Sequence, residues 1–156
     1  MEKTLAMKFL EGKKIRYEAV TYPNTIRDAV EVAAQIGVSP EQVFKTLVVK
    51  RPSAKPMLVI IPANRTLDLK KLAQAAGVKK LKMATHQEAE EMTGLQVGGI
   101  SPLLLINKGF DIYLDVAAQS HEQIYISAGQ RGINLKIGVA DLLKVTRARW
   151  VNAASS

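Results

Sequence analysis

The chain lacks the residue sets that most hydrolases use for covalent or general-base catalysis. It has no cysteine and two histidines, His86 and His121, neither of which lies in a metal-binding spacing. Neither a Gly-x-Ser-x-Gly elbow nor a phosphate-binding loop occurs, since Ser-Pro follows Gly98-Gly99. His86 adjoins a predicted helix start and is interpreted as a surface residue. If the chain is an enzyme, we expect it to work without a conventional nucleophile, a metal or a cofactor.

A single charge inside an otherwise apolar segment is the first candidate for chemistry. Lys45 lies within Val43–Val49, a segment that reads as a strand. Its ammonium could reach solvent from an edge strand while its stem stays buried. Alternatively, it could be a cation in a cleft that meets a phosphate or a polarised ester. The pattern alone leaves both interpretations open.

Two glycine-containing segments are the other candidates. In Gly98–Pro102 the glycines permit close backbone approach and the proline stiffens the exit. Such a loop could aim N–H groups at a developing oxyanion, or it could be a plain turn. In Tyr125–Gly132, Ser127 and Arg131 could face a substrate, although a solvated turn explains the segment equally well.

Charge points to the class of partner. Twenty-two Lys and Arg against 14 Asp and Glu give a formal charge of +8, which favours a polyanion. Aromatic residues make up only 5%, so shape and phosphate contacts would have to supply the binding. The longest apolar runs, Met57–Ile61 and Leu103–Ile106, are strand-sized, so neither a signal peptide nor a membrane helix is predicted. We expect a cytoplasmic protein.

The elements that must position these residues can be read from caps and periodicity. Helices are predicted from about Leu5, Thr25, Asp68, Thr85 and Val139. Strands are predicted at Tyr17–Tyr22, Phe44–Lys50, Met57–Ile61 and Lys79–Met83, and as two hairpins, Leu103–Ile106 with Phe110–Asp115 and Ile124–Ala128 with Asn134–Ile137. This order predicts an α+β fold with a mixed sheet in one domain, residues 1–152, followed by a frayed tail, 153–156.

Taken together and in order, these segments resemble the YbaK family, also called the prolyl-tRNA-synthetase-associated domain. The resemblance runs from about Lys8 to Trp150. Its anchors are Tyr22, Phe44–Val49, Leu67–Lys71, Thr93-Gly94, Val97–Pro102, Leu114-Asp115 and Ile124–Gly132.

The resemblance implies a compact α+β fold with a barrel-like mixed sheet flanked by helices. It also implies hydrolysis of tRNA(Pro) charged with a wrong amino acid, with prolyl-tRNA synthetase as a further partner. Gly-Gly-Ile-Ser-Pro at Gly98–Pro102 is similar to the cysteine-clearing branch rather than the alanine-clearing one. One departure stands against this: Val116-Ala117-Ala118 replaces the usual Ala-Pro-Ala after Asp115.

Site residues follow from the same resemblance. The implied catalytic residues are Lys45, Gly98, Gly99 and Ser101. The implied substrate-binding residues are Tyr22, Phe44, Thr46, Pro102, Asp115, Ser127 and Arg131. Candidates for the tRNA backbone are Lys70, Lys71, Lys79, Lys80 and Arg147, which solvated surfaces explain nearly as well.

No general base is evident, so the predicted mechanism is substrate-assisted. A ribose hydroxyl next to the ester would orient or activate water, or the thiol of a cysteinyl group would attack its own carbonyl and leave a cyclic thioester. Three alternatives remain. They are an Ala-tRNA(Pro) deacylase, a non-catalytic tRNA- or synthetase-binding module of the same fold, and a hydrolase of small esters. The intact Lys45 and Gly98–Pro102 loop favour catalysis over pure binding.

Overall fold

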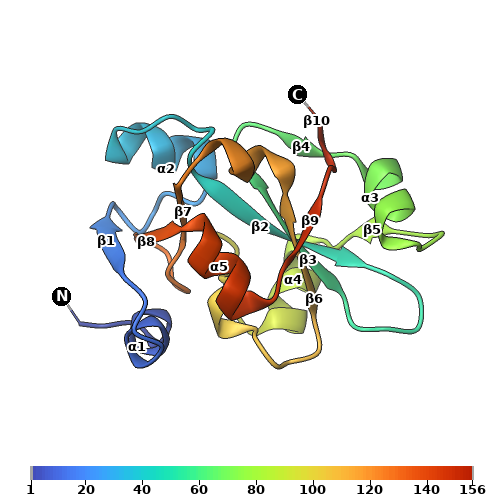
Figure 1. Ribbon diagram of the computed structural model, residues 1–156, viewed down its shortest axis with the longest axis horizontal. Coiled ribbons are helices and arrows are strands. Elements are labelled where there is room, and N and C mark those ends of the chain that lie inside the picture. Colours follow the sequence, from blue (N-terminus) through green and yellow to red (C-terminus); the bar gives the residue numbers. More distant parts are fainter. Residues whose placement is uncertain (1, 156) are drawn as a thin grey trace.

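Residues 2–155, which a computed structural model describes, form an α+β domain with mixed sheets (Figure 1). The helices are α1 (Leu5–Gly12), α2 (Ala29–Ile36), α3 (Leu69–Ala76), α4 (His86–Thr93) and α5 (Val139–Thr146), with 3₁₀ turns η1 (Pro102–Leu104) and η2 (Val116–Ser120). The strands are β1 (Tyr17–Thr21), β2 (Phe44–Lys50), β3 (Met57–Pro62), β4 (Thr66–Leu67), β5 (Lys82–Met83), β6 (Asp111–Asp115), β7 (Gln123–Ser127), β8 (Ile133–Gly138), β9 (Arg149–Val151) and β10 (Ala154–Ser155). Within residues 2–155, no helix combines the length and apolarity that crossing a membrane requires.

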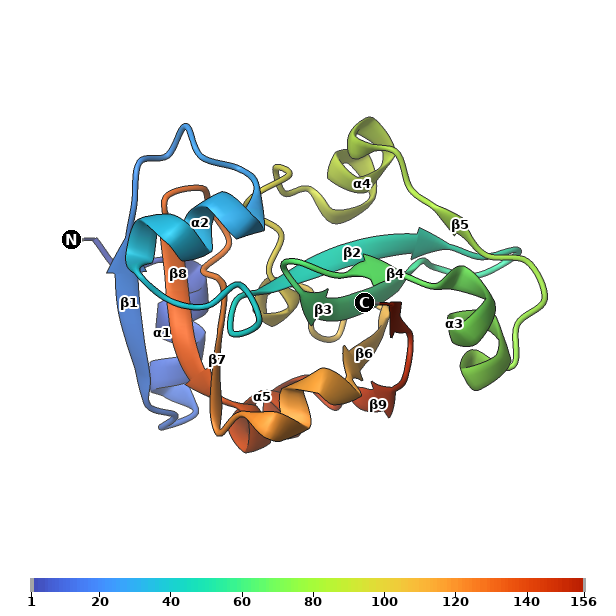
Figure 2. The ribbon, with the colours of Figure 1, turned by 90° about the horizontal axis from the view of Figure 1, so that it is seen from above.

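The central sheet has the strand order β5-β2-β3-β6-β9 and is covered on both faces. Every residue of β3 is buried, and successive side chains enter opposite cores because strand side chains alternate. Leu58 and Ile60 join the core that α1, α4 and α5 share with the other large sheet. Val59 and Ile61 join a second core with Leu72 of α3. Figure 2 shows α2 and α4 on one side of β2, with α5 and β9 on the other.

A second sheet, β1-β8-β7, contains the hairpin predicted at the third candidate segment. Ile124 opposes Ile137 and Ile126 opposes Leu135, so the buried face is in register. A parallel bridge between Val43 and Tyr125 links this hairpin to the start of β2. Within the described residues, the strand pairing between the two sheets is limited to this isolated bridge, so the sheets do not close into a barrel.

The capping signals largely place the helices as predicted. Asp68 accepts backbone N–H groups at the start of α3, and Thr85 with Glu88 forms a complete capping box for α4. Helix α2 begins later than predicted, because Asp28 rather than Thr25 is its N-cap. Its carboxylate accepts the N–H of Glu31.

The predicted hairpin of Leu103–Ile106 with Phe110–Asp115 is wrong. Pro102 occupies the first position of η1 and Ser101 caps it, so the first segment turns instead of extending. Strand β6 instead pairs in parallel with β3 and β9, which are distant in sequence.

The predicted frayed tail is also wrong for residues 153–155. Ala153 is fully buried, and β10 pairs antiparallel with β4. The Asp115 carboxylate accepts the N–H groups of Ala153 and Ala154 at 3.0 and 2.9 Å, which anchors the tail. Ser156 lies outside the described residues.

Candidate functional site

A cavity of about 610 Å³ lies between β2, α2, α4, the loop at residues 97–100 and the β7–β8 hairpin. It is lined by Tyr22, Arg27, Asp28, Ala29, Val32, Val43, Phe44, Lys45, Thr46, Leu47, Val48, Met83, Ala84, His86, Ala89, Glu90, Val97, Gly98, Ile100, Ser127, Arg131 and Asn134. All three candidate segments from the sequence contribute to this wall. A cavity of this size falls in the range that holds a nucleoside-sized ligand.

Lys45 is the half-buried cation of this cavity. Its ammonium donates a hydrogen bond to the carbonyl oxygen of Ala63 at 3.0 Å. Burial lowers the pKa of Lys45, and the nearby Asp28 carboxylate partly opposes this. An ammonium carries three N–H donors, so one fixes the side chain and others can face a ligand. The structure therefore places Lys45 in a cleft rather than in open solvent.

A buried polar pair forms another part of the wall. The Asn134 amide donates to the Tyr22 hydroxyl at 3.0 Å, and both residues are buried. Burial is the main cause that raises the pKa of Tyr22, so its phenol stays protonated. The Tyr22 hydroxyl thus keeps a proton that it can donate into the cavity.

The loop at residues 97–100 is held by a three-residue clamp. The Glu90 carboxylate on α4 accepts the N–H of Val97 at 2.9 Å. The guanidinium of Arg131 donates to the Val97 carbonyl at 2.7 Å and lies 4.0 Å from the Glu90 carboxylate. Helix, loop and hairpin are therefore locked together at one edge of the cavity. Gly98, at φ +88°, follows this clamp in a backbone conformation that favours glycine.

Gly99 has a packing role. A Cβ atom there would lie 2.9 Å from the Cα of Gln130, so glycine allows the loop to touch the hairpin. Its N–H donates to the carbonyl of Gln96 at 2.7 Å. That donor is therefore engaged, and Gly99 is not among the residues that line the cavity.

Three further predicted site residues also lie outside the cavity wall. Ser101 is fully buried, and its hydroxyl accepts the N–H of Leu103 at 3.3 Å. Pro102 is buried as the first residue of η1. Asp115 is buried and accepts the N–H of Ala117 in addition to those of the tail. These three residues are not among those that line the cavity, and their hydrogen bonds and packing hold the loops behind it.

Sequence reasoning misses four titratable residues that line the cavity, Arg27 among them. The pattern around His86 indicates an isolated surface residue and places no histidine near the candidate loops. The fold instead brings His86 and Glu90 of α4, together with Asp28, to the cavity wall. The capping box at Thr85 locates the start of α4, but not the surface on which α4 packs. Glu90 and Asp28 each accept a backbone N–H group, and both Asp28 and His86 are exposed.

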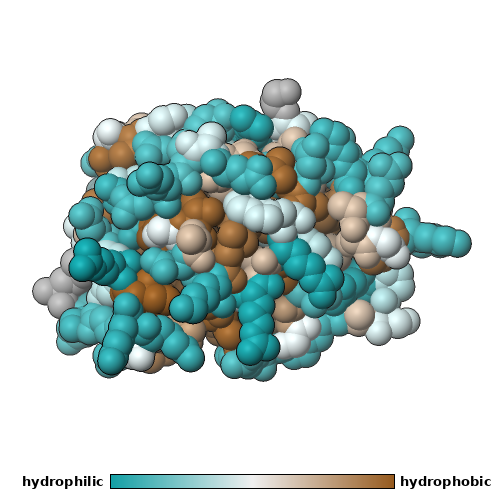
Figure 3. All heavy atoms as spheres, in the orientation of Figure 1, coloured by the Kyte–Doolittle hydropathy of each residue, from teal (hydrophilic) through white to brown (hydrophobic). Residues whose placement is uncertain are grey.

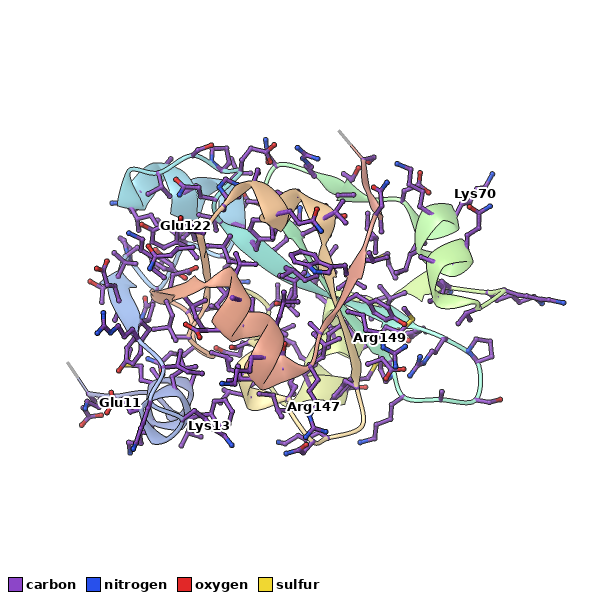
Figure 4. The ribbon with its side chains drawn as sticks, viewed as in Figure 1. Glu11, Lys13, Lys70, Glu122, Arg147 and Arg149 are labelled. Atoms are coloured by element: carbon purple, nitrogen blue, oxygen red, sulfur yellow. The ribbon has the colours of Figure 1, made fainter. Side chains whose placement is uncertain are left out.

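The cations predicted to meet a tRNA backbone do not share one surface. Lys70 and Lys71 lie on α3, while Arg147 ends α5, on the side of β2 opposite α4 (Figures 2 and 4). On the face with α5 and β9, hydrophilic side chains are interspersed with hydrophobic ones (Figure 3). Lys80 lines a second hollow of the surface, and none of the five lines the cavity that holds Lys45.

The fold and this cavity define an α+β domain that holds a half-buried lysine beside a clamped glycine loop. A family model described as "Aminoacyl-tRNA editing domain" matches residues 23–145. The chain belongs to this family, which confirms the resemblance found in the sequence.

Individual relatives agree with this assignment. The "Putative Cys-tRNA(Pro)/Cys-tRNA(Cys) deacylase EbsC" of Enterococcus faecalis is 35% identical over 151 residues, covering 96% of this chain and 92% of the relative. The proline–tRNA ligase of Thermosipho melanesiensis is 34% identical over 99 residues, covering 64% of this chain and 17% of the ligase. A solved structure described as a "putative trans-editing enzyme for prolyl tRNA synthetase" superposes with a TM-score of 0.81, at 23% identity, covering 99% of this chain and 100% of the other; it shows the fold.

Proposed function

We propose that this chain is a deacylase of mischarged tRNA whose preferred substrate is Cys-tRNA(Pro). The observation that supports this best is the Lys45 ammonium, half-buried in a cavity large enough for a terminal adenosine and its aminoacyl ester. The Gly-Gly-Ile-Ser-Pro segment and the name of the Enterococcus relative support cysteine as the amino acid. The match to part of a proline–tRNA ligase supports tRNA(Pro) and the synthetase as partners.

Such an activity answers a limit of synthetase specificity. A pocket shaped for proline rejects a similar or smaller amino acid by only about 1–3 kcal/mol, so errors must be removed at a second site. A domain that hydrolyses the wrong ester after release corrects those errors.

The chemistry we propose is substrate-assisted hydrolysis. Water attacks the ester carbonyl, the bond from that carbon to the ribose oxygen breaks, and the ribose oxygen takes up a proton. The neighbouring ribose hydroxyl, or the thiol of a cysteinyl group, accepts or relays the proton that water loses. Alternatively, that thiol attacks the carbonyl, the bond to the ribose oxygen breaks, the thiol proton passes to that oxygen, and the amino acid leaves as a cyclic thioester. Lys45 stabilises the negative charge that develops on the carbonyl oxygen.

The cavity wall carries two exposed side chains that could compete for the role of base, Asp28 and His86. Asp28 accepts the N–H of Glu31 through one carboxylate oxygen, and the half-buried Glu90 accepts the N–H of Val97. General-base catalysis is worth about 10²–10⁴-fold, so its loss is easy to measure. His86→Ala and Asp28→Asn are therefore the variants that separate a protein base from substrate assistance.

The test uses tRNA(Pro) charged with cysteine, serine, alanine or proline, with and without the ribose hydroxyl beside the ester. We expect the cysteinyl ester to react fastest and prolyl-tRNA to be spared. Replacing the hydroxyl should slow the alanyl and seryl esters strongly, and His86→Ala and Asp28→Asn should each change rates less than tenfold. A hundredfold loss in either variant with normal rates for the altered substrates would overturn substrate assistance. Binding without hydrolysis of any ester would support the adaptor alternative instead.

A further inference from the structure

A second hollow, of about 260 Å³, lies at the far end of β2. Its wall consists of Lys50, Arg51, Pro52, Lys80, Leu81 and Lys82, and we call it the basic groove. Four of these six residues carry a positive charge, and they come from two segments about 30 positions apart in the chain. The fold brings these four charges together, whereas the sequence alone predicts Lys80 in a set with Lys70, Lys71, Lys79 and Arg147.

The groove contains an unfavourable arrangement of charge. Lys50 and Lys82 are directly opposite each other in the antiparallel pairing of β2 with β5. Like charges at directly opposed positions destabilise a sheet. The Glu88 carboxylate on α4 offsets part of this repulsion at Lys50, and an anion bound beside Lys82 would offset more of it.

The charges of the groove are only partly neutralised. Lys50 pairs with Glu88 of α4, and Arg51 pairs with Asp111 at 2.8 Å. Across residues 2–155, no carboxylate lies within 4.0 Å of the Lys80 or Lys82 ammonium among the ion pairs of the chain. Two positive charges therefore face solvent at the rim of a concave surface.

The basic groove continues from the cavity along the same elements. Val48 lines the cavity, and Lys50, two residues further on, points to the same face of β2. Met83 lines the cavity directly after Lys82 of the groove. At about 3.3 Å per residue, Lys50 lies about 17 Å along β2 from Lys45. The same alternation points Lys45 and Lys50 to opposite faces of β2, so a chain of nucleotides whose end lies beside Lys45 would pass over the edge of β2 before its pairing with β5 begins.

We propose that the basic groove binds the backbone phosphates of the nucleotides that precede the 3′-terminal adenosine of the tRNA. This inference rests on the proposed function for the identity of the polyanion. Edge protection is the alternative, since lysine on an edge strand such as β5 discourages pairing between molecules. It does not account for Lys50 and Arg51, which lie on or beyond the internal strand β2.

The test compares Lys80→Gln/Lys82→Gln with a control, Lys8→Gln/Lys13→Gln, which removes the same charge from α1 and its C-cap. Neither control residue lines either hollow, and Figure 4 shows Lys13 beside α1. Affinity for uncharged tRNA(Pro) is measured by fluorescence anisotropy between 50 and 300 mM salt. Two lost phosphate contacts should reduce the slope of log K against log salt by about 1.4, which is about 25-fold in affinity at 0.1 M salt. The control should lose less than threefold, and the melting temperature of the groove variant should be unchanged or higher.

A second arm separates this inference from the proposed function. Cysteinyl-adenosine has the ester but no preceding phosphates, so the groove variant should hydrolyse it as the wild type does while losing activity on Cys-tRNA(Pro). Equal slopes for the groove variant and wild type would overturn the inference, whether or not deacylation is found. Absence of tRNA binding by the wild type would also overturn it. Dimers of the groove variant on size exclusion, with unchanged tRNA affinity, would assign the lysines to edge protection.

Discussion

Replacing Lys45 by methionine removes the ammonium from the cavity and keeps most of the apolar stem. If the ammonium stabilises the developing charge on the ester carbonyl, its loss should cost what removal of one preorganised donor costs in comparable sites. That cost is about 10²–10³ in the rate of the chemical step. We expect Lys45→Met and Lys45→Ala to lose deacylation of Cys-tRNA(Pro) by this factor. Lys45→Arg should remain poor, because a planar guanidinium cannot replace a compact ammonium in the same space.

The stability of these variants should stay near that of the wild type. The substitution removes the hydrogen bond to the Ala63 carbonyl, worth about 1 kcal/mol. It also removes a charge whose lowered pKa reflects burial, and that relief opposes the loss. The two effects have opposite signs, so the free energy of unfolding should change by about 1 kcal/mol or less. Methionine should be closer to neutral than alanine, since it leaves no gap beside the strand.

The assay is single-turnover deacylation with saturating enzyme, which reports the chemical step, paired with thermal unfolding of each variant. Tyr22→Phe serves as a comparison that changes the cavity wall but keeps the cation. A near-normal rate in Lys45→Met, together with a normal melting curve, would refute the assignment of Lys45. A large loss of stability in Lys45→Met would instead show that the hydrogen bond to Ala63 contributes more to the free energy of unfolding than burial of the charge costs.

Other variants test the loops behind the site. Gly99→Ala should destabilise the protein by about 1–3 kcal/mol and reduce activity, because the new Cβ would lie 2.9 Å from the Cα of Gln130. The control Gly12→Ala should be tolerated, because nothing lies within 4 Å of its Cβ. Chemical denaturation measures both variants. Asp115→Asn should lower the free energy of unfolding by about 1–3 kcal/mol, because it weakens the hydrogen bonds to Ala153 and Ala154. The deacylation rate at low temperature should stay normal. A loss of rate without a loss of stability would instead support a role for Asp115 in substrate binding. Hydrogen bonding from Lys50 is the main cause that lowers the pKa of Glu88 to about 2. The stability that this pair contributes should therefore be lost as pH falls from about 4.5 to 2. Glu88→Gln should flatten this pH dependence in acid titrations followed by circular dichroism.

Local signals in the sequence determined much of the secondary structure. Capping residues at Asp68 and Thr85 and the turn that ends in Gly132 act within a few positions, so they can be read without a fold. The apolar run that becomes β3 likewise follows from the chain alone. The family could also be recognised from the sequence, because its motifs recur in order along nearly the whole chain.

Only the tertiary structure decided what each motif contacts. Gly98 and Gly99 are neighbours in one motif, yet Gly98 lines the cavity and Gly99 packs on the hairpin. Ser101 belongs to the same motif, and only the fold shows that its hydroxyl caps η1 and lies outside the cavity wall. His86 reaches the cavity because α4 packs against β2, a contact between residues about 40 positions apart.

The physical reason is the range of the interactions. Caps, turns and strand alternation depend on neighbours along the chain, and their energies are set by residue type. The burial of Lys45, the clamp on Val97 and the repulsion of Lys50 by Lys82 depend on partners that hydrophobic packing brings together from distant segments. The amino-acid sequence therefore determined most of the elements and the family, and the packing of those elements decided which side chains line the cavity.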